Sequence, residues 1–430
     1  MSPKVQELFS DQPALGHYVR IGSTNHVQLE GLLESGRLTV DRPVFDAGLI
    51  FRQAGLLRAF REAGAELVLD TDVAELSSAK YFDSSLKQAP WAVAGRALSV
   101  QDFQGSMGLE RISLIARFAV QHGFRTVLSP THLIKGPRDL GLRVDFETAE
   151  KLRAALDAEG GHKITLDFPL VFAAGVLRDE HLISILVDSL KGLPIENLWV
   201  RSSGFGADAT PIGIVRYIRA LRELLPLSRP IIADGVAGLA GMAALAFGAA
   251  SGIAHGVGIH ETFKSNDWDK RRKVGGGGQP TRVLINALDR QLKLDQVQAI
   301  VATTNGRRLI SCNVPRCCPK GLEDMLRDPK AHYCYQRRLA VDSLTSVPYA
   351  RRAGHFVGRM VTEARERGRL LARLKLADPD THKALADSCE RVQRIHDVLG
   401  HFHAQNDFSE HSPPIRDRRG TSRNAVRGLS

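Results

Sequence analysis

Residues 230–258 read PIIADGVAGLAGMAALAFGAASGIAHGVG. A short apolar run ends at Asp234 and Gly235, a Gly/Ala-rich segment with apolar side chains at helical spacing follows, and a second short run leads to His255. This order predicts a strand, a loop, a short helix and a further strand. In a barrel of alternating strands and helices the carboxyl ends of the strands form the active face, so we expect Asp234 and His255 to lie there.

Glycines in the same stretch predict an anion site. Gly235, Gly238 and Gly241 leave backbone N–H groups uncovered at the start of the expected helix. A phosphate or another anion is readily held at such a position.

A membrane span is the competing interpretation of this stretch. Residues 235–254 carry no charge, and 20 residues are enough for a bilayer helix by length alone. Thirteen of the 20 are Gly or Ala, and no Lys or Arg adjoins them directly. The segment is therefore only weakly hydrophobic, and we predict that it does not cross a membrane.

The alternation of strand and helix continues towards the N-terminus. Apolar runs that predict strands lie at 38–47, 66–69, 126–128, 163–166 and 197–200, and apolar residues at helical spacing separate them. With the two strands of the first stretch this makes seven, which favours an α/β fold, a closed (β/α)8 TIM-like barrel; an open doubly wound sheet is the alternative. We expect the eighth strand near 92–94 or after Arg282.

The chain is long enough for such a barrel and an appendage. We divide its 430 residues into five parts. These are a lead-in (1–37), the barrel (38–265), a basic Gly-rich loop with a small Cys/His subdomain (266–345), a helical basic region (346–405) and a disordered tail (406–430).

Polar side chains follow several of the expected strands. Asp167 ends the strand at 163–166, and Arg201 and Ser202 follow the strand at 197–200. Asp70 and Asp72 form a pair of carboxylates at the end of the strand at 66–69, which is a candidate acid/base site. An aspartate that caps a helix is an equally good explanation of that pair.

Charge and cysteine content constrain the partner and the compartment. The chain has 58 Lys and Arg against 47 Asp and Glu, a net charge of +11, which fits a polyanionic partner such as RNA or DNA. The run DKRRK at 269–273, with four glycines at 275–278, suits phosphate contacts, although such runs are more often solvated loops. Five cysteines and no secretory signal favour reduced thiols and a cytoplasmic protein.

Four of the five cysteines gather in one short segment. The pattern Cys-x4-Cys-Cys-x13-His-x-Cys places thiols and an imidazole at the spacing of two clustered pairs, and these are the ligands of a structural zinc ion. Buried reduced cysteines are the alternative. The candidate zinc ligands, of which four are needed, are Cys312, Cys317, Cys318, His332 and Cys334.

The late strands and the Cys/His cluster together resemble the tRNA-guanine transglycosylase superfamily, which includes relatives that insert deazaguanine bases into DNA. The resemblance rests on IIADGV at 231–236, SGIAHGV at 251–257 and the cluster that follows, and its layout covers residues 70–334. It implies a (β/α)8 barrel, a zinc subdomain after it, and exchange of a base in tRNA or DNA against a small purine-like base. The implied mechanism is a covalent link between an aspartate and the ribose carbon. A homodimer or partner subunits are left open.

The sequence departs from this superfamily at its catalytic positions. The family places its nucleophilic aspartate at the end of the strand where this chain has His255. The family's Asp-Ser-Gly-Gly-Phe-Gln loop corresponds at best to DFQGS at 102–106, and its zinc spacing is tighter. Another carboxylate then has to attack, or the chemistry is lost. The candidate catalytic residues are Asp102, Asp167, Asp234 and His255.

Base exchange needs a carboxylate at the ribose, a second acid/base group and donors that read the edge of the base. The base must also leave its stack. The candidate substrate-binding residues are Gln104, Arg201, Ser202 and Gly235. Two alternatives stay open: a barrel enzyme that binds a phosphorylated small molecule or flavin through its glycines, and a non-catalytic nucleic-acid-binding barrel.

Overall fold

The computed structural model describes residues 14–23, 26–82, 84–258, 261–270, 281–406 and 408. The basic Gly-rich run expected at 269–278 and the tail expected from 406 lie almost entirely outside the described residues. None of the described helices is long and apolar enough to cross a membrane.

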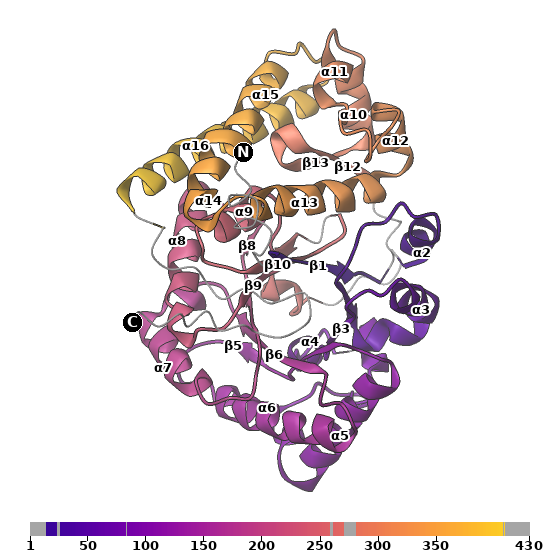
Figure 1. Ribbon diagram of the computed structural model, residues 1–430, viewed down its shortest axis with the longest axis vertical. Helices are drawn as coiled ribbons and strands as arrows, with labels where there is room; N and C mark the ends of the chain where they lie inside the picture. Colours follow the sequence, from indigo (N-terminus) through magenta and orange to yellow (C-terminus); the bar gives the residue numbers. More distant parts are fainter. Residues whose placement is uncertain are drawn as a thin grey trace, which may run out of the picture.

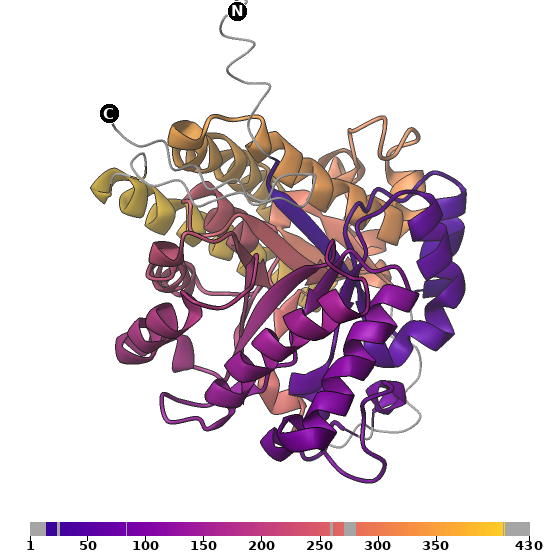
Figure 2. The ribbon, with the colours of Figure 1, turned by 60° about the horizontal axis from the view of Figure 1, so that its bottom comes forward.

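Eight parallel strands form a closed barrel (Figure 2). Every neighbouring pair is parallel, and the barrel closes where the first strand pairs with the last, with Gly16 opposite Gly252. The pairing of β4 with β6 completes the ring, and the short β5 (Leu133–Ile134) adds to the end of β6. The eight strands are β1 (Gly16–Ile21), β2 (Pro43–Asp46), β3 (Val68–Asp70), β4 (Thr126–Leu128), β6 (Thr165–Phe172), β7 (Leu198–Ser202), β9 (Ile231–Asp234) and β10 (Gly252–Gly256).

The predicted (β/α)8 fold is confirmed, but the eighth strand was misplaced. It is β1, in the segment expected to be a lead-in. Residues 92–94 form no strand, and the strand after Arg282 belongs to a separate hairpin. The apolar pattern does not predict a strand for GHYVRI because His17 and Arg20 interrupt it, although five of its six residues are buried.

Helices join successive strands and cover the outside of the barrel. Helix α8 illustrates why the sequence begins a helix there: the Thr210 side chain accepts from Gly213 N, and Pro211 occupies the first turn. Its apolar stripe, from Ile214 to Leu221, packs inward. The helices of this layer are α2 (His26–Glu34), α3 (Ala54–Glu62), α5 (Gly105–Gln121), α6 (Gly141–Ala158), α7 (Glu180–Leu190), α8 (Pro211–Arg222) and α9 (Gly238–Ala246). The short helix α4 (Val73–Leu76) instead follows β3 at the carboxyl end of the barrel, where Glu75 contacts Arg201.

The inside of the barrel is a packed core. Seven strands each contribute one inward residue to a single apolar cluster: Tyr18, Val44, Val68, Leu128, Trp199, Ile232 and Ala254. Since side chains alternate along a strand, the residue two positions later on each strand also points inward, at the carboxyl end of the barrel. This parity determines which residues meet at the mouth.

After the barrel, the chain forms an appendage that packs on one side of it (Figure 1). Helix α13 lies against β1 and α9, and α16 lies against α8. The appendage has its own small apolar core, which includes Leu288, Val297 and Leu385. Its elements are β12 (Arg282–Ile285), β13 (Arg290–Lys293), α10 (Leu294–Val301), α11 (Gly306–Ile310), α12 (Leu322–Arg327), α13 (Pro329–Thr345), α14 (Tyr349–His355), a π-helical segment (Phe356–Val361), α15 (Thr362–Ala372) and α16 (Pro379–Gln405).

Candidate active site and candidate metal centre

Five inward-pointing charged residues meet at the carboxyl ends of the barrel strands. Each lies two positions after a residue of the barrel's inner apolar cluster. They are Arg20 on β1, Asp46 on β2, Asp70 on β3, Arg201 on β7 and Asp234 on β9. We call this group, with Asp72 and Glu75 just after β3, the mouth cluster.

Asp234 is the centre of the mouth cluster and is fully buried. Arg20 donates to both of its carboxylate oxygens, from Nε at 2.8 Å and from Nη2 at 2.6 Å. Arg201 donates from Nε at 2.8 Å. Although burial raises the pKa of Asp234, these two guanidinium groups outweigh it and lower that pKa.

The same two arginines also hold Asp70, the last residue of β3, and Glu75, which follows that strand. Asp70 Oδ2 accepts from Arg20 Nη1 at 2.7 Å and from Arg201 Nη2 at 3.0 Å. Glu75 Oε1 accepts from Arg201 Nη1 at 2.6 Å. Two guanidinium groups are therefore shared by three carboxylates, and their positions are fixed by charge-assisted hydrogen bonds.

The carboxyl groups of the mouth cluster differ in protonation. Arg20 and Arg201 overcome the effect of burial and lower the pKa of Asp70 to about 2. Burial, opposed by Arg20 and reinforced by Asp70, raises the pKa of Asp46 to about 7. Burial and the neighbouring carboxylates also raise the pKa of Asp72. Neutral and ionised carboxyl groups thus lie side by side, which is the arrangement that acid/base chemistry uses at neutral pH.

Asp46, Asp70 and Asp72 each present an oxygen within 4.8 Å of the other two. Asp72 adopts a left-handed conformation, with φ 57°, and its amide donates to Asp70 Oδ1 at 3.0 Å. The side chain of Asp46 is 25% exposed, against 8% for that of Asp70, and Asp72 is buried. Asp46 is therefore the carboxyl group of this trio that a substrate can reach most easily.

Aromatic side chains cover the mouth cluster. Phe263, on the short strand β11 (Thr262–Phe263), lies over the Arg201 guanidinium at 5.6 Å. Trp268 is 4.9 Å from Phe263 and 6.4 Å from Tyr81, measured between ring centroids. We call residues 261–268 the roof segment.

Asp167 is not at the mouth. β6 runs to Phe172 instead of ending at Leu166, so Asp167 lies early in the strand and is fully buried inside the barrel. Its carboxylate accepts from Asn197 Nδ2 at 2.6 Å and Trp199 Nε1 at 2.8 Å. The expectation that Asp167 ends its strand is wrong, and the residue instead accepts from buried donors below the mouth.

His255 also misses the mouth. Ala254 points into the barrel, so His255 points outward, towards α13, where it is fully buried. Its Nε2 lies 3.0 Å from His17 Nε2, and its Nδ1 lies 3.1 Å from Tyr333 Oη. The inward position at the end of β10 is Gly256, so this strand supplies no acid/base group to the mouth.

Asp102 and Gln104 lie in the connection before α5 and make local contacts. Asp102 accepts from both Nη atoms of Arg96 at 2.7 Å and from Ser99 N at 2.8 Å. The hydrogen bonds from Arg96 lower the pKa of Asp102 most, and the bond from Ser99 lowers it further. Gln104 is exposed at the start of α5. The structure therefore does not bring either residue into the mouth cluster.

Of the predicted substrate-binding residues, Arg201 is in the mouth cluster and Ser202, the next residue, points to the opposite face of β7. Gly235 has φ 75° and its amide donates to Ala254 O. It therefore turns the chain after Asp234 and does not present a free N–H.

The start of α9 is already occupied by a carboxylate. Asp289 Oδ2 accepts from Leu239 N at 2.8 Å, and a Cβ on Gly238 would lie 2.3 Å from Asp289 Oδ1. Arg337 Nη1 pairs with the same carboxylate at 2.9 Å. The expected phosphate site at this helix start is therefore filled by the chain's own anion.

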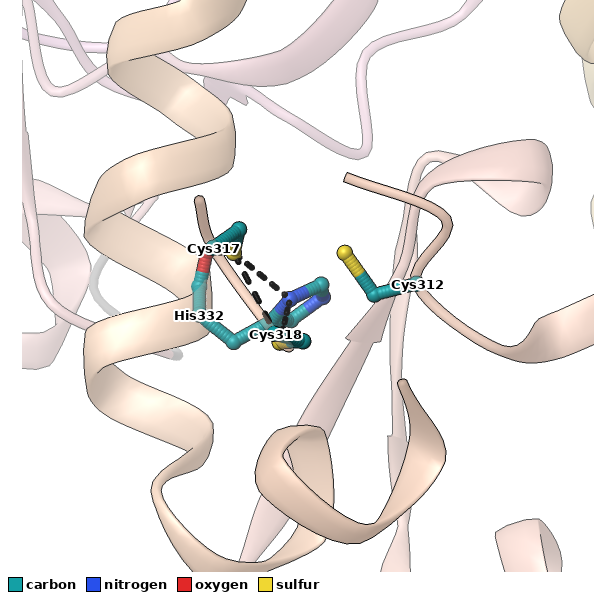
Figure 3. A group of neighbouring side chains, drawn as sticks. All are labelled: Cys312, Cys317, Cys318 and His332. Carbon is teal, nitrogen blue, oxygen red and sulfur yellow. Dashed lines mark hydrogen bonds between the residues drawn. The ribbon is translucent and has the colours of Figure 1, made fainter. Parts of the chain in front are cut away.

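The candidate metal centre is in the appendage. Cys312, Cys317, Cys318 and His332 each present one ligand atom, and these atoms all lie within 4.8 Å of one another. Figure 3 shows His332 on its helix facing Cys317 and Cys318, with Cys312 on the other side. His332 Nδ1 is 3.4 Å from Cys317 Sγ and 3.5 Å from Cys318 Sγ.

The second nitrogen of His332 supports metal binding. Nε2 lies 3.1 Å from Leu284 O, which can only accept, so Nε2 carries the proton and the Nδ1 lone pair faces the thiols. This is the usual outer contact of a metal-ligating histidine. Three cysteines and one histidine fit a closed tetrahedral zinc site.

Cys334 is separate from this group. It is fully buried in the main core, and burial raises the pKa of its thiol to about 12. His332 and Cys334 are two residues apart on α13, so their side chains leave the helix on nearly opposite faces.

Sequence reasoning missed Arg20, Asp46 and Glu75. Asp46 had a signal, because PVFD, LVLD and IIAD are three apolar runs that each end in aspartate. Arg20 is a lone cation near the end of an apolar run that was not taken as a strand. Glu75 lies in the short helix α4, beyond any strand pattern.

No protein-family model matches the chain, and no curated protein matches it. Solved structures similar to it include the type I 3-dehydroquinate dehydratase of Clostridium difficile, with 9% identity over 60% of this chain and 91% of that one and a TM-score of 0.37. A xylanase of Cellvibrio japonicus has 13% identity over 58% and 87%, with a TM-score of 0.35. An HpcH/HpaI aldolase of Desulfitobacterium hafniense has 10% identity over 59% and 89%, with a TM-score of 0.32. These likenesses carry no argument about chemistry.

Proposed function

We propose that this chain is a barrel enzyme that breaks and remakes the bond between a base and its ribose in a nucleic acid, tRNA or DNA, in the manner of a transglycosylase. The observation that carries the proposal is the pair of carboxyl groups in the mouth cluster, Asp46 and Asp70, whose oxygens lie within 4.8 Å of each other. Asp46, with a pKa of about 7, holds a proton that it can give, and Asp70, with a pKa of about 2, stays ionised.

These two carboxyl groups suit glycosidic chemistry. In glycosidases that retain configuration, one carboxyl group protonates the leaving group and a second, about 5 Å away, attacks the sugar carbon. The oxygens of Asp46 and Asp70 approach within 4.8 Å. In the proposed reaction Asp46 protonates the departing base, while Asp70 forms a bond to the ribose carbon as the base's bond breaks. An incoming base then displaces Asp70 and returns its proton to Asp46.

The roof segment supports a base as the substrate. A base that has left its stack is usually held between aromatic side chains. Phe263 lies over Arg201 of the mouth cluster and Trp268 packs against Phe263, so aromatic rings adjoin the cluster.

The distribution of charge supports a nucleic acid as the partner. Residues 266–430 contain 31 Lys and Arg against 18 Asp and Glu, whereas residues 1–265 contain 27 against 29. The whole excess of positive charge therefore belongs to the part of the chain beyond the barrel. Such a region gains affinity for a phosphate backbone by counterion release.

The metal centre has no reacting role in this proposal. Cys312, Cys317, Cys318 and His332 would hold zinc, which supplies a structural cross-link when bound and has no open position for a substrate.

The experiment is release and exchange of a labelled purine base from tRNA and from duplex DNA. We expect Asp46→Asn and Asp70→Asn each to lower the rate by about a hundred-fold or more, as loss of an acid or a nucleophile does. Asp188→Asn is the matched control, because this aspartate is exposed on α7 and pairs only with Lys191 among the described residues. Salt-dependent binding without exchange would remove the catalytic half of the proposal and leave a binding protein.

A further inference from the structure

We propose that helix α13 connects the metal centre to the roof segment, so that metal loading fixes residues 261–268 over the mouth of the barrel. The inference goes beyond the proposed reaction and does not depend on it. It rests on contacts at both ends of the first three turns of α13 and on Glu261, whose side chain accepts hydrogen bonds from Tyr333, Arg337 and Gln291, all in the appendage.

Glu261 joins the roof segment to α13. Tyr333 Oη donates to Glu261 Oε1 at 2.8 Å, and Arg337 Nε donates to the same oxygen at 2.9 Å. Glu261, Tyr333 and Arg337 are each less than 9% exposed. These buried, charge-assisted bonds are of the strong kind, and Glu261 has no comparable partner on the barrel among the described residues.

The roof segment follows Glu261 directly. Thr262 and Phe263 pair with β8 (Phe205–Gly206), and Ser265 N donates to Ser203 Oγ at 2.9 Å. Trp268 O accepts from Ser78 Oγ at 2.9 Å. The segment is therefore held by short contacts along its length, and Glu261 is its attachment to the appendage.

The metal centre holds the other side of the same helical turns. His332 precedes Tyr333 in the sequence, and its imidazole lies between the cysteine thiols and Leu284 O. The start of α13 has no capping hydrogen bond from the Asp328 side chain. Ala331, Tyr333 and Cys334 are also buried in these turns, and His332 is the residue that holds the side of the helix facing the thiols.

Metal binding is expected to act on the roof segment through α13. A metal that cross-links His332 to Cys312, Cys317 and Cys318 fixes the rotation and position of the first turns of α13. Tyr333 then meets Glu261, and the roof segment is held at the mouth. Without this cross-link, the first turns keep their buried contacts, including those of Tyr333 with His255 and Gly256 O, but lose the bond that fixes the side of the helix facing the thiols.

Hydrogen exchange measured by mass spectrometry tests the link without any enzyme assay. We compare the zinc-loaded protein with the same folded protein after chelation. Amides at 261–268 are expected to exchange about ten-fold or more faster after chelation, as the loss of a hydrogen bond to a charged group implies. The strands β6 and β7 are expected to be unchanged.

A variant that keeps the metal isolates the helix. Tyr333→Phe removes the hydroxyl that donates to Glu261, so it is expected to speed exchange at 261–268 at unchanged zinc content. Tyr335→Phe is the control, since Tyr335 is on the same helix and makes no hydrogen bond to Glu261 among the described residues. Unchanged exchange at 261–268 in chelated protein, with changes confined to 310–335, overturns the link. Unchanged exchange in Tyr333→Phe overturns it equally.

Discussion

Replacing Asp234 by asparagine tests the mouth cluster most directly. The Asp234 carboxylate is fully buried and accepts three hydrogen bonds, two from Arg20 and one from Arg201, at 2.6–2.8 Å. An amide of the same shape has no charge, and its NH2 group would face guanidinium donors. Removing one partner of a buried ion pair costs about 3–5 kcal/mol, because it leaves buried charge without compensation.

That cost predicts a measurable loss of thermal stability. One kcal/mol shifts the melting temperature by about 2–4 °C in domains of 150–250 residues, and less in larger ones. We therefore expect Asp234→Asn to melt about 6–10 °C below the wild type at pH 7, followed by circular dichroism. Asp188→Asn, at an exposed site, is expected to stay within about 0.5 kcal/mol of the wild type.

The pH dependence of the free energy of unfolding tests the same ion pairs. Asp234 and Asp70 have pKa values below those of the unfolded chain, so their contribution is present above about pH 4 and is lost as the pH falls towards 2. Asp234→Asn should lose less stability over this range than the wild type. A variant that melts with the wild type at pH 7 would refute the reasoning, since the ion pairs would then contribute nothing.

Three further predictions concern other parts of the molecule. The purified protein is expected to hold about one zinc ion per chain by elemental analysis. The Cys317→Ser/Cys318→Ser variant should lose this zinc, whereas Cys334→Ser and Cys389→Ser should keep it. Loss of zinc in Cys334→Ser would contradict the proposed set of ligands. Because the pKa of Asp46 is raised to about 7, its ionisation destabilises the fold as the pH rises from about 4 through 7, so Asp46→Asn should gain stability relative to the wild type at pH 8 in urea unfolding. No difference between pH 5 and pH 8 would count against the raised pKa. Trp199→Phe removes a donor to the buried Asp167 and is expected to cost about 1–3 kcal/mol in the same assay, whereas an unchanged midpoint would show that Asp167 does not depend on this bond.

The sequence could predict the barrel because its late strands are short apolar runs bounded by glycine. It could not reveal β1, whose polar residues face two different environments. Arg20 points to the mouth, and His17 points outward to His255. A strand buried on both sides that carries a histidine and an arginine has no period that an apolar pattern would detect.

Parity along a strand explains why Asp234 lies at the mouth and His255 does not. Asp234 was placed correctly, since it is in phase with the inward Ile232. His255 was one position out of phase with Ala254, and a shift of one residue exchanges the two faces of a strand. Asp167 was misjudged for another reason: β6 is longer than its apolar run, and the residue that was expected at its end lies near its start.

The candidate metal-binding residues were closer to prediction. The sequence named five candidates, and the periodicity of a helix would have been enough to separate His332 from Cys334, had the segment been recognised as helical from Pro329. Bringing Cys312 to this group required the hairpin and loops of the appendage, whose geometry no short motif in the sequence specifies.

Closure of the barrel between its first and last strands has a consequence for synthesis. β1 leaves the ribosome early, yet its partner β10 follows only after the other six strands of the ring have been made. Until then both β1 and β9 present unpaired edges, which are templates for association between chains. Contacts this distant in sequence also form slowly. Nascent chains that stop before Gly252 should therefore be the species that depends most on chaperones.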